Sequence, residues 1–283
     1  MKYYFVAVLF LFMSATIAQN KSPYAVFSKN GKKLSYEKLL EAAQKSDVVL
    51  FGELHDNSVI HWLQLEFLKD MHSKKGLVLG AEMIEADNQK QLNQYLKNEI
   101  TSERLDSTAR MWPNFKTDYK PLVDFAKDKK IDFIATNVPR RYARMVYKKG
   151  FEALEQLSPE EKSWMSPLPI PYDSKLPGYA KMITEMGGHG GDNLPKAQAI
   201  KDATMAYFIL ENRKENALFI HFNGTYHSEN FEGIYWYLKK EQNNLKIMTI
   251  ATVAQDDINK LEKENQQLAD FILVIDEDVT KTY

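Results

Sequence analysis

The sequence predicts an α/β fold: a mostly parallel sheet flanked by helices, with a smaller inserted helical subdomain. Short apolar runs alternate with stretches of about ten to fifteen residues that carry apolar positions at helical spacing, which is typical of β-α-β crossover units. Several runs are continuously apolar, as expected of strands covered on both faces. Apolar residues make up 44% and charged residues 27% of the 283 residues, the mixture of an ordinary globular protein.

Residues 1–18 differ from the rest of the chain. Lys2 precedes an apolar run from Tyr3 to Met13, and small residues follow up to Ala18, which is the pattern of a secretory signal peptide. The alternative is an uncleaved membrane anchor, but the run is shorter than the roughly 20 residues that a spanning helix needs. We therefore expect cleavage after Ala18, with residues 19–283 forming a single soluble α/β domain in the periplasm or at the cell surface.

Charge and cysteine content exclude several classes of protein. Without residues 1–18 the chain keeps 36 basic residues against 38 acidic ones, a net charge of −2, which argues against nucleic acid as a partner. Cysteine is absent, which excludes disulfides, thiolate nucleophiles and zinc-thiolate sites. Because no cysteine follows the signal to carry a lipid, we do not expect a bacterial lipoprotein.

The N-terminal half contains a hairpin and three strand-to-helix cycles. Asn30-Gly31 is a favoured hairpin turn between short segments at 24–27 and 32–35. A helix over 36–45 leads into a buried strand over 48–51, and Asp56-Asn57-Ser58 can cap the helix that follows. The next apolar run covers 77–81, with a helix over 87–98, and a third begins at Ile131 after a helix over 119–130.

The C-terminal half departs from this pattern before it returns to it. Five prolines fall between Ser158 and Gly178, which predicts an irregular excursion rather than sheet. Residues 100–118 and 158–195 are therefore expected to form helical cap elements. A helix from Pro195 to about Arg213, a strand over 217–222 and a helix over 229–240 follow, and two strands at 246–253 and 271–275 close the chain.

Polar side chains follow four successive predicted strands. In chain order they are Glu53 with His55, Glu82, Asn137 with Arg140, and Asn223 with His227. Because the carboxyl ends of parallel strands share one edge of a sheet, we expect these side chains to converge there. The sequence therefore predicts a site that uses Glu53, His55, Glu82, Asn137, Arg140 and His227 as candidate catalytic residues.

Two of these strand ends have the same form, a glycine three residues before a histidine: Gly52 to His55 and Gly224 to His227. Two imidazoles with Glu53 and Glu82 would suit a divalent metal ion with an open position for water. In a metal-free alternative, His55 or His227 acts as a general base. The plainer alternative is that Glu53 is a solvated loop acid and His55 a capping or packing histidine.

The chain resembles the ChaN-like haem-binding uptake family over about residues 40–255. The similar motifs are Val48 to His55, Ala81-Glu82-Met83, Trp112-Pro113, Tyr119 to Leu122, Asn137 to Arg140, and residues 224–227. The resemblance implies haem or iron handling at the cell envelope, with dimerisation around haem and contact with envelope uptake machinery. The wider superfamily, with Tiki-type metalloproteases and erythromycin-esterase-like proteins, implies metal-dependent hydrolysis by Glu53, His55, Glu82 and His227 as the alternative function.

Haem would add its own ligands, since imidazole and phenolate both bind haem iron. His189 lies between two glycine pairs, and Tyr172 and Tyr179 lie in the same irregular region. Their plainer roles are a loop residue and two packing residues. Arg140 could hold a propionate, or could instead form a salt bridge at a helix start. Three further histidines are expected outside the site, His221 in the core and His61 and His72 at the surface or in packing.

Overall fold

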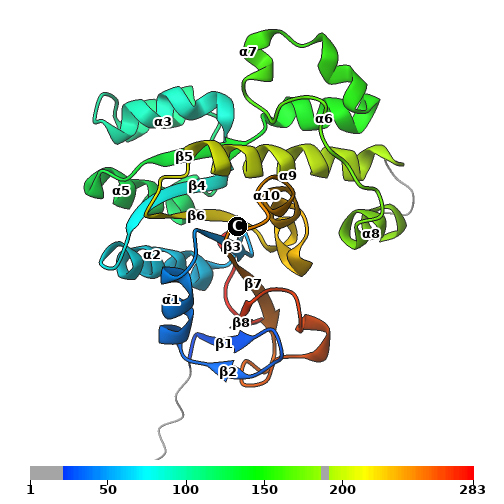
Figure 1. Ribbon diagram of the computed structural model, residues 1–283. Helices are drawn as coiled ribbons and strands as arrows, with labels where there is room; N and C mark the ends of the chain where they lie inside the picture. The colour runs from blue at the N-terminus through cyan, green and yellow to red at the C-terminus, as the bar shows by residue number, and fades with distance from the viewer. Residues whose placement is uncertain (1–21, 186–190) are drawn as a thin grey trace, which may run out of the picture.

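The structure, a computed structural model, describes residues 22–185 and 191–283. An eight-stranded sheet of order β2-β1-β8-β7-β3-β6-β4-β5 runs through it (Figure 1). The strands from β8 to β5 are parallel, and β1 and β2 add an antiparallel edge. This confirms the predicted mostly parallel α/β sheet. The strands are β1 (Tyr24–Ser28), β2 (Lys33–Leu34), β3 (Val48–Glu53), β4 (Gly76–Glu85), β5 (Phe133–Asn137), β6 (Ala217–Gly224), β7 (Ile247–Gln255) and β8 (Phe271–Asp276).

Helices cover both faces of the sheet (Figure 1). The helices that contribute to the core on one face are α1 (Tyr36–Gln44), α2 (Ser58–His72), α3 (Gln89–Leu96), α4 (Ser102–Thr108) and α5 (Lys120–Lys129). Those on the other face are α6 (Arg140–Lys149), α9 (Asn193–Asn212) and α10 (Ile234–Glu241). In β3, Val49 and Phe51 pack into the first core and Val48 and Leu50 into the second. Because both faces are buried, this strand is continuously apolar rather than alternating.

The two segments expected to form cap elements add no strand in their described residues. Residues 100–118 form α4 and most of a π-helical turn, Phe115–Tyr119, that leads into α5. Residues 158–195 contain two short helices, α7 (Pro159–Lys162) and α8 (Pro177–Glu185), and the start of α9. The π-helical turn matters for the site because it carries Asp118 and Tyr119 inward, where both are buried.

Among the strands that extend further than the sequence predicts, β4 and β3 affect the position of the two site glutamates. The run expected to end at Ala81 continues to Glu85, so Glu82 lies inside β4 and does not follow it. The pairing of β4 with β6 stops at Ala81, and its pairing with β5 shifts register between Ala81 and Glu85. Glu82 thus stands where β4 has stopped pairing with β6 and its register with β5 shifts. In the same way β3 continues through Glu53, which pairs with Gly224.

Two further sequence-based expectations concern the ends and loops. Within residues 22–185 and 191–283, no helix combines the length and apolar character needed to cross a membrane. Residues 1–18, predicted to be a signal peptide, and His189, predicted to contact haem, lie outside the described residues. Both assignments stay predictions.

Candidate functional site

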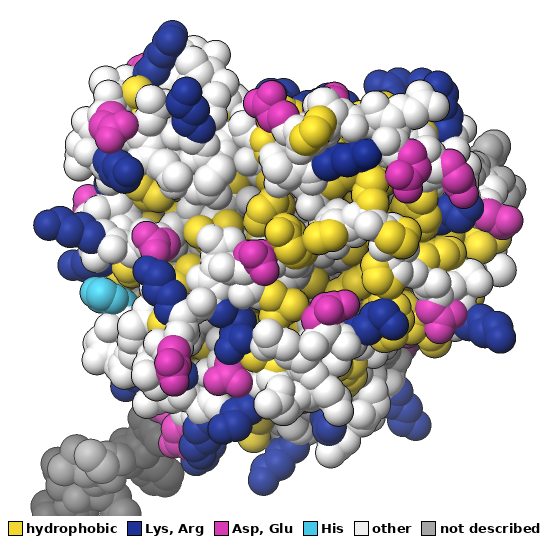
Figure 2. Space-filling view, turned by 45° about the horizontal axis from the view of Figure 1, so that its top comes forward, with side chains coloured by type: hydrophobic (Ala, Val, Ile, Leu, Met, Phe, Trp, Pro, Cys, Tyr) yellow, Lys and Arg dark blue, Asp and Glu magenta, His cyan; other side chains and the backbone are white. Residues whose placement is uncertain are grey.

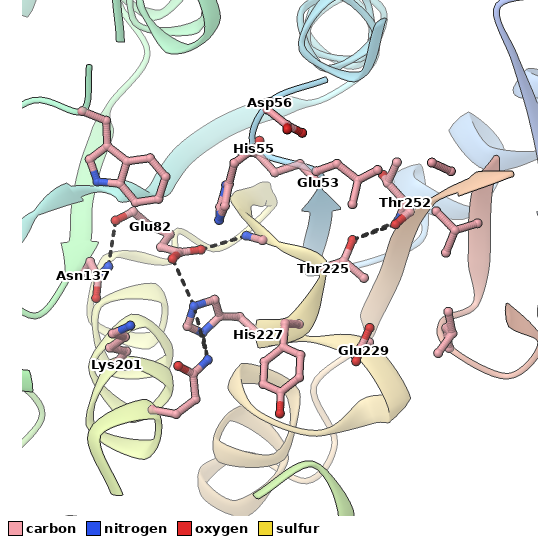
Figure 3. A pocket seen from close by; sticks show the side chains of 18 of the residues that line it. Glu53, His55, Asp56, Glu82, Asn137, Lys201, Thr225, His227, Glu229 and Thr252 are labelled. Carbon is pink, nitrogen blue, oxygen red and sulfur yellow. Dashed lines mark hydrogen bonds and ion pairs between the residues drawn. The ribbon is translucent and has the colours of Figure 1, made fainter. Parts of the chain in front are cut away.

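A pocket of about 1160 Å³ opens at the carboxyl ends of β3, β4 and β6 (Figure 3). Six residues of its lining are those that the sequence singled out as candidate catalytic residues: Glu53, His55, Glu82, Asn137, Arg140 and His227. These six side chains therefore lie together at one edge of the sheet, whereas Asn223, also predicted there, is fully buried and is not part of the lining. The chemical role of each residue stays a prediction.

His55 is held by Glu53 on one side of the pocket. Its Nδ1 lies 2.9 Å from Glu53 Oε1, and because a carboxylate only accepts, Nδ1–H donates and Nε2 is left for other contacts. The Glu53 side chain is fully buried, whereas that of His55 is 31% exposed. Burial lowers the pKa of His55, but the hydrogen bond to Glu53 and the charges of Glu82 and Glu53 outweigh it, so this pKa is raised.

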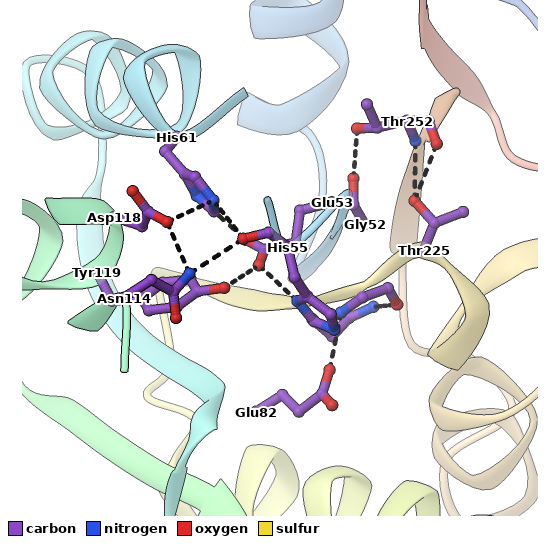
Figure 4. A network of polar contacts seen from close by, with 12 residues as sticks. Gly52, Glu53, His55, His61, Glu82, Asn114, Asp118, Tyr119, Thr225 and Thr252 are labelled. Atoms are coloured by element: carbon purple, nitrogen blue, oxygen red, sulfur yellow. Dashed lines mark hydrogen bonds and ion pairs between the residues drawn. The ribbon is translucent and has the colours of Figure 1, made fainter. Parts of the chain in front are cut away.

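A network of buried polar side chains holds Glu53 in position (Figure 4). The Tyr119 hydroxyl donates to Oε1 over 2.7 Å, and the Gln64 amide donates to Oε2 over 2.5 Å. His61 and Asn114 contact the backbone carbonyl of His55 over 3.0 and 3.1 Å. Burial and the charge of Glu53 raise the pKa of Tyr119 far above its usual value, so its hydroxyl remains a donor. Glu53 and His55 are therefore fixed in position before any ligand arrives.

His227 lies between two carboxylates on the opposite side of the pocket (Figure 3). Its Nε2 is 3.0 Å from Glu82 Oε1, and its Nδ1 is 2.5 Å from Asp202 Oδ1. Both partners accept, so both ring nitrogens donate and the ring is an imidazolium. The second oxygen of Glu82 accepts from the Gly224 backbone N–H over 2.8 Å, and Tyr179 donates to the second oxygen of Asp202 over 2.8 Å.

The pKa values of this group agree with its hydrogen bonds. Burial lowers the pKa of His227, but the charges of Glu82 and Asp202 outweigh it and raise this pKa to about 9. Burial raises the pKa of Glu82, but the charge of His227 outweighs it and holds this pKa far below its usual range. At neutral pH the group is therefore a charged, buried arrangement of two carboxylates around one imidazolium.

The two matching motifs require glycine for different steric reasons. A Cβ on Gly52 would lie 2.6 Å from the carbonyl oxygen of Ile250, so this position lets β7 and β3 approach each other. A Cβ on Gly224 would lie 2.8 Å from His55 Nε2. The glycine of the second motif therefore makes room for the histidine of the first.

Asn137 and Arg140 occupy the β5 side of the pocket. The Asn137 amide donates to the backbone carbonyl of Glu82 over 3.0 Å. Its Oδ1 is buried without a hydrogen-bond partner in the described structure. Arg140 is exposed at the first position of α6. This side therefore offers one unsatisfied acceptor and one cation to a ligand.

Sequence reasoning missed the residues that support the site. Asp202 went unnoticed although it is a charged residue on the buried side of α9, which is a usable signal. Tyr119 was part of the motif that carries the family resemblance, but no role followed from it. His61, expected at the surface or in packing, is 6% exposed and lies in the network behind Glu53. His221 is fully buried in the core, as predicted.

The two tyrosines predicted to contact haem lie away from the described lining of the pocket. Tyr179 is buried and its hydroxyl is engaged with Asp202, while Tyr172 stacks on it with ring centroids 5.7 Å apart. Burial and the charge of Asp202 raise the pKa of Tyr179 far above its usual value. The geometry gives Tyr179 a positioning role toward Asp202, and a role in haem contact stays a prediction for both.

The predicted metal ligands form a hydrogen-bonded cluster. In residues 22–185 and 191–283, no group of three or more His, Asp or Glu side chains is arranged to hold a metal ion. Both oxygens of Glu82 and both ring nitrogens of His227 contact protein atoms. The described arrangement therefore gives no support to the predicted divalent metal ion at Glu53, His55, Glu82 and His227. That metal site stays a prediction.

Comparisons with known proteins give the same family and fold. Among curated proteins, Protein RETICULATA-RELATED 5, chloroplastic, of Arabidopsis thaliana is 28% identical over 200 residues; the match covers 64% of this chain but only 26% of that protein. Among solved structures, ChaN of Campylobacter jejuni, described with cofacially bound haem, has a TM-score of 0.68 at 18% identity, over 90% of this chain and 98% of that one. A Bacillus cereus protein has a TM-score of 0.51 at 10% identity, over 85% and 90% of the two chains.

The structural likenesses, at these identities, establish the fold. The family follows from a family model, described as haem-binding uptake, Tiki superfamily, ChaN, which matches residues 39–238 and so covers well over half of the chain. Both β3, with Glu53, and the η4 turn Thr225–His227 fall inside this match. The chain therefore belongs to the ChaN family of haem-binding uptake proteins, within the Tiki superfamily.

Proposed function

We propose that this protein binds haem in the pocket at the carboxyl ends of β3, β4 and β6. Its family is described as haem-binding, and ChaN of Campylobacter jejuni is described with cofacial haem. The pocket volume of about 1160 Å³ exceeds the range of about 300–1,000 Å³ that is typical of small-molecule sites. The pocket therefore has room for a large, flat ligand.

The observation that carries the proposal is the position of exposed tyrosines. Among the described residues, four large hydrophobic side chains are exposed, and two of them, Tyr226 at 42% and Tyr283 at 68%, line this pocket. A third, Tyr147, borders an adjoining hollow. Exposed aromatic rings in a pocket supply flat apolar surface against which a planar ligand can stack. A phenolate is also an established type of haem ligand, so Tyr283 suits both the ring and its iron. The Tyr226 hydroxyl donates to the Gly178 carbonyl, so Tyr226 suits the ring alone.

The histidines divide into one that suits haem iron and one that does not. Bound haem supplies an iron with axial positions for imidazole or phenolate. His227 donates from both ring nitrogens to carboxylates, so it has no lone pair to offer. His55 uses only Nδ1 for Glu53 and keeps Nε2. The residues that fit an axial role are thus Tyr283 and His55, because the Tyr226 hydroxyl donates to the Gly178 carbonyl over 3.1 Å.

Haem titration of the purified protein tests the proposal. We expect a Soret band that differs from that of free haem, and Tyr283→Phe should shift the band and weaken binding. Tyr207→Phe is the matched control, because it removes a hydroxyl from a partly exposed tyrosine of α9 that borders neither this pocket nor the two adjoining hollows. A spectrum that remains the sum of free haem and protein at every ratio overturns the proposal.

Hydrolysis is a second candidate, favoured by one observation. Nδ1–H of the partly exposed His55 donates to a buried carboxylate, which fixes the tautomer with a basic Nε2, as a general base requires. A panel of ester and peptide substrates, run with elemental analysis for a divalent metal, tests it. Activity should disappear in His55→Gln. Activity that survives this change would assign the hydrolysis to other residues.

We also propose a role in iron uptake at the cell envelope. In this proposal residues 1–18 are a cleaved export signal, and the protein forms a dimer around haem. Figure 2 shows hydrophobic side chains gathering on the side where Figure 1 places α6 and α8, and apolar surface of this kind suits a protein partner such as a second copy or the uptake machinery. Intact mass tests export, because the secreted protein should begin at Gln19. Light scattering with and without haem tests dimerisation.

A further inference from the structure

The exposed face of α6 carries a group of cations beside the pocket. Arg140 and Arg144 are one helical turn apart, so their side chains share one face of α6. Arg140 lines the main pocket and two adjoining hollows, one of about 790 Å³ and one of about 490 Å³. Arg144 borders both hollows, and Lys201 of α9 borders the smaller hollow and the main pocket. These three side chains, which we call the basic clamp, therefore lie where the three spaces meet.

The cations of the basic clamp differ from the arginines next to them. Arg110 pairs with Glu85 and Asp87, and Arg141 pairs with Asp87. In the part of the chain that the structure describes, no carboxylate lies within ion-pair distance of Arg140, Arg144 or Lys201 (residues 22–185 and 191–283). All four arginines border the larger hollow, but two of them, Arg110 and Arg141, are paired with carboxylates. Arg140 and Arg144 are thus the arginines of this hollow whose charge a ligand could compensate.

The walls beside the basic clamp are apolar and aromatic. Met111, Trp112 and Pro113 border the larger hollow, and Trp112 also lines the main pocket. Tyr147 and two alanines border the smaller one. Cations next to flat apolar walls match a ligand that has a flat apolar body with acidic groups at its edge. Arg140 also stands at the N-terminus of α6, where the helix dipole favours an anion.

We propose that Arg140, Arg144 and Lys201 bind the two carboxylate side chains of a porphyrin whose ring lies in the main pocket. This inference rests on the proposed haem binding and adds the element that recognises the edge of the ring. Arginine suits the task because its guanidinium binds a carboxylate through two parallel hydrogen bonds. The basic clamp therefore recognises the carboxylates and not the iron. The affinities for haem and for iron-free protoporphyrin should both depend on it.

Esterified ligand separates the two proposals. The purified protein is titrated with haem and with haem dimethyl ester by absorbance, and with protoporphyrin by its fluorescence. The double variant Arg140→Gln, Arg144→Gln should weaken haem and protoporphyrin binding by about three- to tenfold, as exposed charge-assisted contacts do, and should leave the ester unchanged. Added salt should reduce the difference between haem and its ester in the original protein.

The matched control is Lys148→Gln, Lys149→Gln, which removes the same charge from exposed positions near the end of the same helix. It should leave all three affinities unchanged. If haem and its ester bind the original protein equally well, or if the arginine variant weakens both equally, the basic clamp is overturned while haem binding stands. If none of the three ligands binds, both proposals are overturned.

Discussion

The two sides of the pocket are built from the same kinds of residue and differ in one respect. On each side a Gly-x-x-His motif provides a histidine, and a buried carboxylate and a tyrosine hydroxyl support it. The first cluster comprises Glu53, His55, Gln64 and Tyr119, and the second comprises Glu82, Asp202, Tyr179 and His227. The difference is that His227 has a carboxylate on each ring nitrogen, whereas His55 has a carboxylate only on Nδ1.

This difference shows that the motif alone does not decide what its histidine does. Two carboxylates make His227 a buried cation with a pKa raised to about 9. One carboxylate and a 31% exposed side chain leave His55 with a nitrogen for a ligand or a proton. We therefore expect the second cluster to stabilise the fold and the first cluster to carry the chemistry.

The largest expected effect is the loss of stability on removing His227. His227→Ala leaves Glu82 and Asp202 buried without their counter-ion, which should lower the free energy of unfolding by about 3–5 kcal/mol. His55→Ala removes a partly exposed ring and should cost about 1 kcal/mol. Urea denaturation at neutral pH measures both. Equal losses of stability in the two variants would contradict the expectation that His227 stabilises the fold while His55 is available to a ligand.

The pH dependence of stability should show the same division. His227 has an ordinary pKa of 6.5 that the fold raises to about 9, which corresponds to about 3 kcal/mol of stability. That contribution is fully present below pH 6.5 and is lost as pH rises through about 9. Denaturation at pH 6, 8 and 10 should reveal this alkaline loss in the original protein and in His55→Ala, but not in His227→Gln.

The acid side should depend on other groups. Glu82, with its pKa lowered from 4.5, contributes stability above pH 4.5 that is lost as pH falls towards the lowered pKa. Burial lowers the pKa of His221 from 6.5 to about 4, so its contribution is lost as pH falls from 6.5 through 4. An alkaline loss that persists in His227→Gln would show that another group causes it.

The two motif glycines should give smaller and unequal effects. Gly52→Ala sets a methyl group 2.6 Å from a backbone carbonyl that is part of the sheet, and we expect a loss of about 1–3 kcal/mol. Gly224→Ala instead meets the ring of His55, a side chain that can rotate away. It should cost less stability but change haem affinity, because His55 moves. Denaturation and haem titration of both variants test this contrast, which fails if Gly224→Ala is the more destabilising.

The supporting tyrosines should give losses of stability no larger than that of Gly52→Ala. Tyr119→Phe and Tyr179→Phe each remove one hydrogen bond to a buried carboxylate, and each should cost about 1.5–3 kcal/mol at most. Only Tyr119→Phe should also change ligand binding, because Tyr119 holds Glu53, the carboxylate that contacts His55. A matching change in haem affinity in Tyr179→Phe would show that the second cluster also reaches the ligand.

The sequence predicted the strands and helices well where patterns are local. Continuous apolar runs located β3, β4 and β6, and Asn57 caps α2 as expected, accepting from the backbone N–H groups of Val59 and Ile60. The predicted end of β4 was wrong by four residues, because the polar Glu82 seemed to stop a strand that in fact continues beside β5 after its pairing with β6 ends. A strand end depends on where its neighbours stop, and this is not a local property.

The sequence by itself determined the set of residues that could meet. Strand ends of a parallel sheet share one edge, so Glu53, His55, Glu82, Asn137, Arg140 and His227 converge by topology alone. Only the tertiary structure decided what each histidine contacts. Asp202 belongs to α9 and Tyr119 to the π-helical turn, and no sequence spacing relates either residue to the Gly-x-x-His motifs. Hydrogen bonds and burial act through space, and these contacts distinguish His55 from His227.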